Sequence, residues 1–194
     1  LKTKIPENIR ESELFYNRKY NGYAKTFTRK RINYLHMEDF VCNLQRLKEL
    51  SKYEVIHRID DDSWFKSKIP KSLGSTLVES EYAKIATSNT YSNISGGHLD
   101  TRVGLFEFTQ NFCMNNGVTP KNRQLREALN ECNHNKFHSL EWSSGNCNLY
   151  VNNIFKNETW HKWIGAVNKN GGCYKQRWGD QEIIGLYLYI YHEK

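Results

Sequence analysis

Apolar and polar positions follow a helical period over several parts of the chain. Between 35 and 50, Phe40, Leu44 and Leu47 recur at helical spacing with polar residues between them, which predicts an amphipathic helix. Helical spacing or a helix-start residue marks four further segments, at 7–20, 100–115, 119–129 and 158–167. We expect these helices to alternate with strands along the chain.

Short β-branched and aromatic runs predict the strands. The clearest run covers 53–59 and leads directly into Asp60. Weaker runs lie at 23–28, 82–87 and 149–151. The apolar segment 181–191 fits either a buried helix or a strand. Alternation of strands and helices is typical of an α/β sandwich whose ligands lie beyond the carboxyl ends of the strands. Since no repeat or linker divides the sequence, we expect one α/β domain over 1–194, with a mixed central β-sheet flanked by helices.

The composition is that of a folded domain with a basic charge balance. Hydrophobic residues make up 38% and charged residues 25% of the 194 positions, which excludes a disordered or collagen-like chain. The 28 Lys and Arg exceed the 21 Asp and Glu, so the formal charge of +7 favours polyanionic partners such as phosphates, nucleotides or nucleic acid. The five Cys form no C-x-x-C pair, which indicates reduced thiols rather than a disulfide framework or a zinc ribbon.

No segment predicts a membrane span or an export signal. No apolar run approaches about 18 residues, and the first residues lack the basic-then-apolar order of a signal peptide. We therefore expect a cytoplasmic location. Because residue 1 is Leu rather than Met, we expect the domain to be part of a longer chain.

Three consecutive carboxylates follow the strand at 53–59. Residues i and i+2 of an extended segment point to the same side, so Asp60 and Asp62 could hold a hard divalent cation, Mn²⁺ or Mg²⁺, together. A solvated turn is the alternative interpretation, but the expected position at the ligand edge of a sheet favours the metal site. His192, which follows the last apolar segment, is a candidate third ligand of the cation. Arg58 is a candidate for binding a nucleotide ligand.

A second candidate motif is Arg177-Trp178-Gly179-Asp180, which follows a Gly-rich turn. An acid beside a tryptophan could face a sugar, because aromatic rings pack on the apolar face of a pyranose and carboxylates bind hydroxyls. Asp180 could equally be the N-cap of the following element. Arg177 could pair with a carboxylate or a phosphate.

Together these motifs resemble the retaining fungal α-mannosyltransferases, a family of GT-A-fold glycosyltransferases. That family carries a "WRVEPD"-like strand end, then a "HFWSNFEI"-like segment, then "ERWGD". The corresponding stretches here, in the same order, are HRIDDD at 57–62, HSLEWSSGN at 138–146 and KQRWGD at 175–180. The resemblance runs from about position 35 to the C-terminus and implies a GT-A-like, Rossmann-related fold.

The resemblance also implies roles for the residues at these positions. Asp60 and Asp62 would hold the metal and the diphosphate of a nucleotide sugar, with Asp61 beside the ribose or the sugar. Asp180 and Trp178 would shape the sugar or acceptor pocket. The reaction would transfer a sugar from a nucleotide-diphosphate sugar, with a UDP-sugar as the first candidate, to a glycan hydroxyl.

One position departs from the family pattern. The family's glutamate near the anomeric carbon falls on or near Asn146, which cannot act as a carboxylate nucleophile. If the family's retention of configuration holds here, the leaving phosphate itself would deprotonate the acceptor on the same face of the sugar. Asn146 would then hydrogen-bond or stabilise the oxocarbenium-like centre.

The chain also resembles virus-encoded glycosyltransferases that decorate a major capsid protein. This second resemblance implies a glycoprotein acceptor and a location in the host cytoplasm.

Two other function classes stay open. A metal-dependent nuclease or phosphotransferase would also use an acidic cluster and a basic surface, although no second carboxylate set at fixed spacing accompanies the first. A non-catalytic carbohydrate- or nucleic-acid-binding module could be built on the many Tyr and Trp residues.

Overall fold

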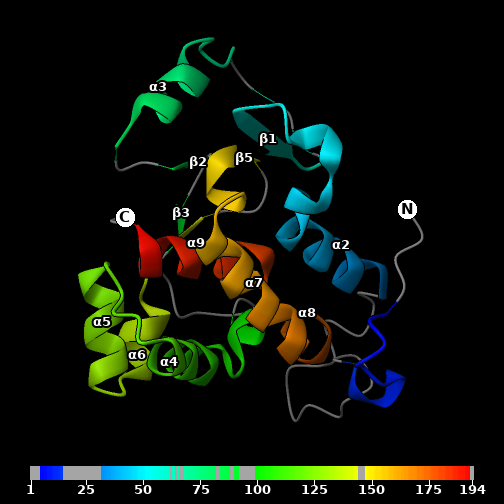
Figure 1. Ribbon diagram of the computed structural model, residues 1–194, viewed down its shortest axis with the longest axis vertical. Coiled ribbons are helices and arrows are strands. Elements are labelled where there is room, and N and C mark those ends of the chain that lie inside the picture. Colours follow the sequence, from blue (N-terminus) through cyan, green and yellow to red (C-terminus); the bar gives the residue numbers. More distant parts are fainter. Residues whose placement is uncertain are drawn as a thin grey trace.

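Helices contribute more of the described structure than strands do, and a small sheet lies above their centre in Figure 1. The computed structural model describes residues 5–14, 32–61, 63, 65, 68–81, 84–87, 90–91, 99–143 and 147–192. The helices are α2 (Ile32–Cys42), α3 (Leu73–Glu79), α4 (Leu105–Asn116), α5 (Arg123–Asn130), α6 (His134–His138), α7 (Glu158–Asn170), α8 (Gly172–Lys175) and α9 (Asp180–Tyr191). The strands are β1 (Val55–Ile59), β2 (Ile85–Thr87), β3 (Thr90–Tyr91), β4 (Trp142–Ser143) and β5 (Cys147–Val151). Short 3-10 turns are η1 (Glu11–Glu13), η3 (Leu44–Arg46), η4 (Lys48–Leu50), η5 (Leu99–Arg102) and η6 (Asn152–Phe155).

The larger sheet has the strand order β1-β5-β2, and both outer strands run antiparallel to β5. Ile59 pairs with Cys147 and Arg58 with Asn148. The end of β1 therefore lies beside the start of β5, and Asp60 leaves the sheet at that edge. Strands β3 and β4 form a separate antiparallel pair.

The two faces of this sheet pack against different cores. Leu149 and Val151 on one face form a small cluster with Leu77 of α3, which lies above the sheet in Figure 1. Ile56 and Tyr150 on the other face belong to the main core. Because side chains alternate along a strand, Arg58 lies on the same face as Ile56 and points toward the main core.

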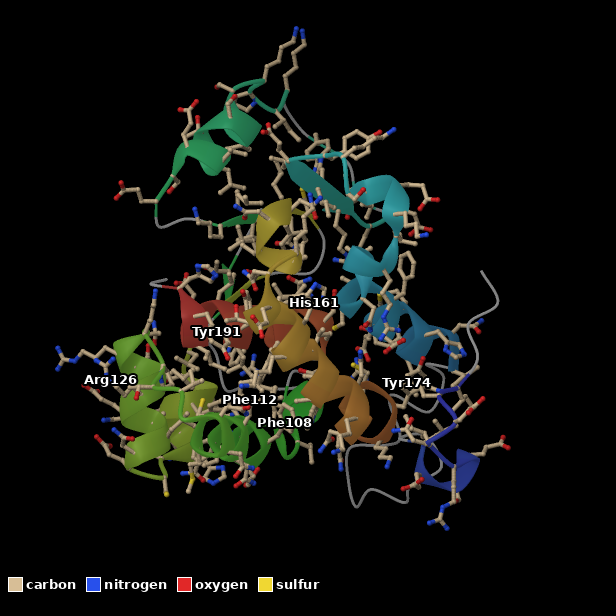
Figure 2. The ribbon with its side chains drawn as sticks, viewed as in Figure 1. Phe108, Phe112, Arg126, His161, Tyr174 and Tyr191 are labelled. Carbon is tan, nitrogen blue, oxygen red and sulfur yellow. The ribbon has the colours of Figure 1, made fainter. Side chains whose placement is uncertain are left out.

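Helix α9 lies in the middle of the main core. Every residue from Asp180 to Ile190 is buried, which is why the segment carries apolar residues on all sides. Helix α7 packs against it, and the indole of Trp163 donates a hydrogen bond to the Ile183 carbonyl at 3.0 Å. On α4, Phe108 and Phe112 lie below α7 in Figure 2, with ring centroids 5.4 and 4.9 Å from Trp163.

The sequence predicted the strands of the larger sheet but neither β3 nor β4. The strand expected at 53–59 is β1, and the runs at 82–87 and 149–151 contain β2 and most of β5. The segment 181–191 is a buried helix, which decides between the two interpretations left open. A small sheet flanked by helices confirms the expected α/β architecture. The strand expected at 23–28 lies outside the described residues.

Several helix boundaries differ from the prediction. The helix expected over 35–50 is α2 followed by two 3-10 turns, and the one expected over 119–129 begins only at Arg123. There the Asn122 side chain accepts a hydrogen bond from the Leu125 amide at 2.8 Å, so an asparagine cap starts the helix instead of the proline. The segment 100–115 is interrupted at Gly104, whose φ of 71° separates η5 from α4.

The predicted helix at 7–20 is, in its described part, the 3-10 turn η1. The helix expected at 158–167 is α7, which extends to Asn170 and ends on Gly171 in the left-handed region. None of the helices in the described ranges is long and apolar enough to cross a bilayer.

Candidate functional site

Arg58 connects the two acidic motifs that the sequence analysis singled out. Its Nη2 lies 2.8 Å from Oδ1 of Asp60, and its Nε lies 3.9 Å from Oδ2 of Asp180. Arg58 and Asp60 lie at the end of β1, whereas Asp180, more than 100 positions later in the chain, starts α9. The structure therefore places the predicted strand-end carboxylate and the predicted RWGD acid beside one guanidinium.

Strand pairing and the start of α9 bring these side chains together. Arg58 and its β5 partner Asn148 share the sheet face that is turned toward the core, where α9 begins. Asp180 is the first residue of α9, and Gly179 is its N-cap. The N-cap role considered for Asp180 is thus taken by Gly179, one residue earlier. In the first helical turn a carboxylate still benefits from the positive end of the helix dipole.

Gln181 ties Asp180 to the sheet. Its Nε2 donates to Asp180 Oδ2 at 2.9 Å and to the Tyr150 hydroxyl at 3.0 Å. Its Oε1 accepts a hydrogen bond from Asn148 Nδ2 at 3.3 Å. No local signal in the sequence assigns a role to Gln181, Tyr150 or Asn148. This network fixes the orientation of the Asp180 carboxylate before any ligand binds.

The two carboxylates differ in their environment. Burial raises the pKa of Asp180, while the charge of Arg58 and the hydrogen bond from Gln181 act in the opposite direction. The Asp180 side chain is 11% exposed, whereas that of Asp60 is 34% exposed. The Asp60 carboxylate is therefore accessible to a solvated cation. The Asp180 carboxylate lies at the rim of the core, where it is suited to a hydrogen bond with a ligand hydroxyl.

A second buried acid lies behind Asp180. Glu38 of α2 is 1% exposed, and burial raises its pKa well above the usual range although the charge of Arg177 opposes this. Its Oε2 has no hydrogen-bond partner among the described residues. Sequence reasoning missed Glu38, yet its spacing from buried Leu35 and Val41 puts it on the apolar face of α2, which was an available signal.

Arg177 stands in a strained loop next to this acid. Its φ of 58° lies in the left-handed region, which is unusual for a residue other than glycine. The guanidinium lies 5.2 Å from the centroid of the Tyr34 ring. The RWGD loop therefore turns sharply at Arg177 and directs its side chain toward α2.

Trp178 lies in the core rather than on a ligand-facing surface. It is 1% exposed, its Nε1 donates to the Val103 carbonyl at 2.6 Å, and its ring centroid lies 4.7 Å from that of Phe108. A Cβ on Gly172 would lie 1.9 Å from the Trp178 ring, so a residue without a side chain is needed at this position to leave room for the indole. The position of Trp178 suits support of the RWGD loop and not stacking on a sugar.

The structure does not bring His192 to this cluster. His192 follows the last residue of α9, a helix of 12 residues, and Asp180 is the first. At about 1.5 Å per residue the two ends are roughly 18 Å apart. His192 thus lies at the opposite end of α9 from Asp180, and its role as a third metal ligand stays a prediction. Asp61 is exposed, whereas Asp62 and Asn146 lie outside the described residues.

The side chains around Arg58 fit a metal–diphosphate ligand in part. Among the described residues no three His, Cys, Asp or Glu side chains come close enough to hold a metal ion. Asp60 nevertheless offers a partly exposed carboxylate, the ligand type that Mn²⁺ and Mg²⁺ prefer. Nη1 of Arg58 is buried and has no partner within the described part of the chain. A buried, unpaired guanidinium N–H is suited to an anionic oxygen such as that of a phosphate.

Comparison with known proteins identifies the fold. No protein-family model and no curated protein matches the sequence. The mannosyltransferase Ktr4p from S. cerevisiae superposes with a TM-score of 0.71 at 18% identity, over 97% of this chain and 48% of that one. Its complex with GDP gives a TM-score of 0.69 at 18% identity, over 96% and 48%. The Mn/GDP form of core-mannan synthase A from Aspergillus fumigatus gives 0.67 at 15% identity, over 82% and 44%. The chain has the fold of these mannosyltransferases.

This finding confirms the GT-A-like fold that the sequence resemblance implied. The chain spans slightly under half the length of these mannosyltransferases. At such identity the likeness describes the fold, and the chemistry of this chain rests on its own residues.

Proposed function

We propose that this chain is a glycosyltransferase domain that moves a sugar from a nucleotide-diphosphate sugar to a glycan hydroxyl with the help of Mn²⁺ or Mg²⁺. The observation that carries the proposal is the pair of contacts by which Arg58 joins Asp60 to Asp180, within a chain that has the fold of mannosyltransferases. Two of the similar structures contain GDP, and one of them also contains Mn.

The residues of the site have separate tasks in this proposal. Asp60, together with Asp62, holds the divalent cation, and the buried N–H of Arg58 donates to a phosphate oxygen. The cation, when bound, neutralises the charge of the leaving diphosphate. Asp180, fixed by Gln181, accepts a hydrogen bond from a sugar or acceptor hydroxyl.

Other roles rest on the sequence resemblance. We propose that Asn146 hydrogen-bonds near the anomeric centre and that configuration is retained, with the leaving phosphate taking the proton of the acceptor. Arg177 is proposed to support the nucleotide side of the site through its contact with Tyr34. Trp178 supports the loop that carries Asp180.

The donor base and the acceptor complete the proposal. A UDP-sugar is the first candidate from the sequence, whereas the GDP in the similar structures favours a guanosine nucleotide. A GDP-sugar and a UDP-sugar are therefore the two donors to compare. The proposed acceptor is a glycan on a glycoprotein in the cytoplasm, for which a viral major capsid protein is the candidate from the sequence resemblance.

Calorimetric titration tests the proposal directly. GDP-mannose, a panel of UDP-sugars and a short DNA duplex are titrated into the protein, each with Mn²⁺ and with EDTA. We expect one nucleotide sugar to bind with Mn²⁺ and to bind far more weakly with EDTA. Binding of DNA without any nucleotide-sugar signal would overturn the proposal and favour the nuclease alternative.

Two variants and a matched control assign the effect to the site. Arg58→Gln removes a charged hydrogen bond worth about 1.5–3 kcal/mol, so nucleotide affinity should fall at least about tenfold. Asp60→Asn should remove the difference between Mn²⁺ and EDTA. Arg123→Gln, at an arginine whose side chain is 84% exposed, should bind like the unchanged protein. Equal affinity in Arg58→Gln and Arg123→Gln would contradict the assigned site.

A further inference from the structure

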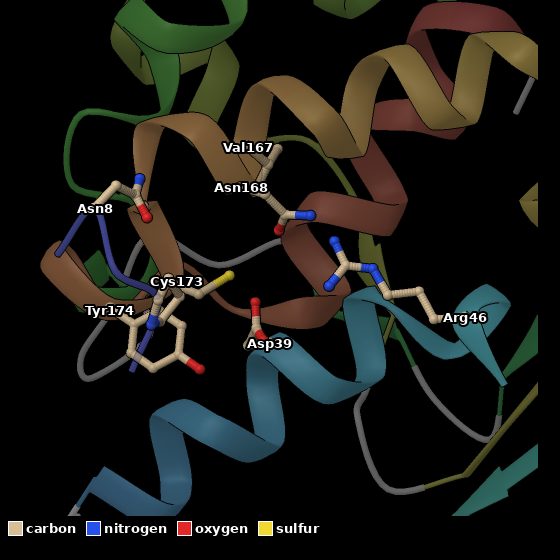
Figure 3. A pocket seen from close by; sticks show the side chains of 9 residues that line it. Asn8, Asp39, Arg46, Val167, Asn168, Cys173 and Tyr174 are labelled. Carbon is tan, nitrogen blue, oxygen red and sulfur yellow. The ribbon is translucent and has the colours of Figure 1, made fainter. Parts of the chain in front are cut away.

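A separate pocket of about 150 Å³ opens between the N-terminal segment, α2 with η3, α7 and α8. Figure 3 shows its side chains around one shared space, with the Arg46 guanidinium and the Asn168 amide directed toward the side of Asp39. The residues that matter for its chemistry are Pro6, Asp39, Arg46, Val167, Asn168 and Tyr174. None of them belongs to the group formed by Arg58, Asp60 and Asp180, so the pocket is distinct from the proposed reaction centre.

Internal hydrogen bonds fix the polar groups of this pocket. Asn43 Nδ2 donates to Asp39 Oδ1 at 3.2 Å, and Asn168 Nδ2 donates to Asn43 Oδ1 at 2.9 Å, which links α2 to α7. The Tyr174 hydroxyl lies 3.0 Å from Nδ1 of His36 and also hydrogen-bonds the Asp39 side chain. The donors and acceptors thus have set positions before a ligand arrives, which lowers the entropy cost of binding.

The charges of the pocket balance each other. Burial raises the pKa of Asp39, and the charge of Arg46 acts against this, so the two groups influence each other across the pocket. Arg46 is exposed, and its guanidinium makes no hydrogen bond with another described residue. One acceptor-rich side, formed by Asp39, therefore faces one donor-rich side, formed by Arg46 and the Asn168 amide, with no excess of either charge.

The lining also has an apolar part, made of Pro6, Val167 and the carbon atoms of the Tyr174 ring. A ligand for this pocket needs hydroxyl groups, which both donate and accept hydrogen bonds, and a C–H surface for the apolar wall. It must also carry no net charge and have about a dozen heavy atoms. A pyranose ring meets all of these conditions. A free anion would be repelled by the Asp39 carboxylate, and an apolar ligand would cover the Arg46 guanidinium without offering it an acceptor.

We propose that this pocket binds one pyranose residue of a glycan, as a carbohydrate subsite apart from the reaction centre. Asp39 accepts hydrogen bonds from sugar hydroxyls, Arg46 and Asn168 donate to them, and the apolar wall covers the C–H face. The inference goes beyond the proposed transferase activity because it requires neither metal nor nucleotide.

Ligand binding is measured by saturation-transfer NMR and by ¹⁵N spectra of the side-chain amides, with EDTA present and no nucleotide. The probes are the methyl α-glycosides of mannose, glucose and galactose, with inorganic phosphate and glycine for comparison. We expect saturable binding of at least one glycoside, with shifts of the Asn43 and Asn168 side-chain amides. Absence of any glycoside binding, or binding of phosphate or glycine instead, would overturn the proposal.

Variants separate this pocket from the reaction centre. Asp39→Asn and Arg46→Gln should each weaken glycoside binding at least about tenfold, whereas Arg123→Gln should not change it. If the protein without substitutions binds a glycoside but shows no Mn²⁺-dependent nucleotide binding, the transferase proposal alone is rejected. Glycoside binding that survives both pocket variants but is lost in Asp60→Asn would place the sugar at the reaction centre and reject the separate subsite.

Discussion

Replacing Glu38 with Gln is expected to change how the free energy of unfolding depends on pH. Burial raises the pKa of Glu38 well above its usual range in the folded protein. In the unfolded chain a glutamate titrates near about 4.3. Above that value the folded protein keeps a proton that the unfolded chain releases. The free energy of unfolding therefore falls as pH rises, until the pH passes the pKa of the folded state.

The size of the effect follows from proton linkage. One such group contributes up to about 1.4 kcal/mol of lost stability for each pH unit. Several groups act on the Glu38 carboxyl, namely Arg177, Asp180, Cys173 and Glu182. Burial also raises the pKa of Asp180, but that group is present in both proteins, so the difference between them isolates Glu38. From about pH 5 to about pH 7 the difference amounts to at most about 2.7 kcal/mol.

Urea unfolding measured at several pH values between about 5 and 7 tests this reasoning. The unchanged protein should lose stability over this range more steeply than Glu38→Gln. A matched control is Glu49→Gln, since Glu49 is exposed, and this variant should keep the slope of the unchanged protein. Parallel curves for the unchanged protein and Glu38→Gln would show that burial does not hold the proton on Glu38.

Two further predictions concern packing and thiol reactivity. Gly172→Ala puts a Cβ 1.9 Å from the Trp178 ring and should destabilise by at least about 1–3 kcal/mol in thermal unfolding. Gly165 lies in the interior of α7, with open space within 4 Å of an added Cβ, so Gly165→Ala should instead stabilise the protein by roughly 0.5–1 kcal/mol. Equal melting temperatures of the Gly172→Ala and Gly165→Ala proteins would contradict both expectations. Exposed Cys132 should react with iodoacetamide in the folded protein, as seen by peptide mass spectrometry. Cys42, buried and with its pKa raised well above the usual range, should react only after unfolding, and its early modification would refute the packing described.

The sequence predicted the elements whose signals are local. A run of β-branched residues ending in acids identified β1 and placed Asp60 at its end, and the apolar segment 181–191 identified a buried element. Helix boundaries were less predictable because a single side chain or backbone conformation decides them. Gly104 in the left-handed region starts α4 later than the candidate cap residue Asp100 suggested.

The candidate site was predictable as separate motifs and not as an assembly. Both Asp60 and Asp180 were identified from their local context, but the antiparallel pairing of β1 with β5 decides that Arg58 reaches both. Glu38 was missed because charged residues are rarely buried without a partner, so its residue type favoured solvent although its spacing put it on the apolar face of α2. The role of His192 stays a prediction, because a sequence position after an apolar segment does not reveal at which end of a helix the site lies.

The place of α9 in the chain has a consequence for how the protein folds. This helix is the centre of the main core, yet 179 residues precede it. Until α9 has been synthesised, the apolar surfaces that α2 and α7 turn toward it have no cover, and Trp163 lacks the carbonyl that its indole binds. Nascent chains without α9 would therefore expose a broad apolar surface and would be targets for chaperones and aggregation. Early termination of synthesis should thus yield insoluble chains, not a smaller folded protein.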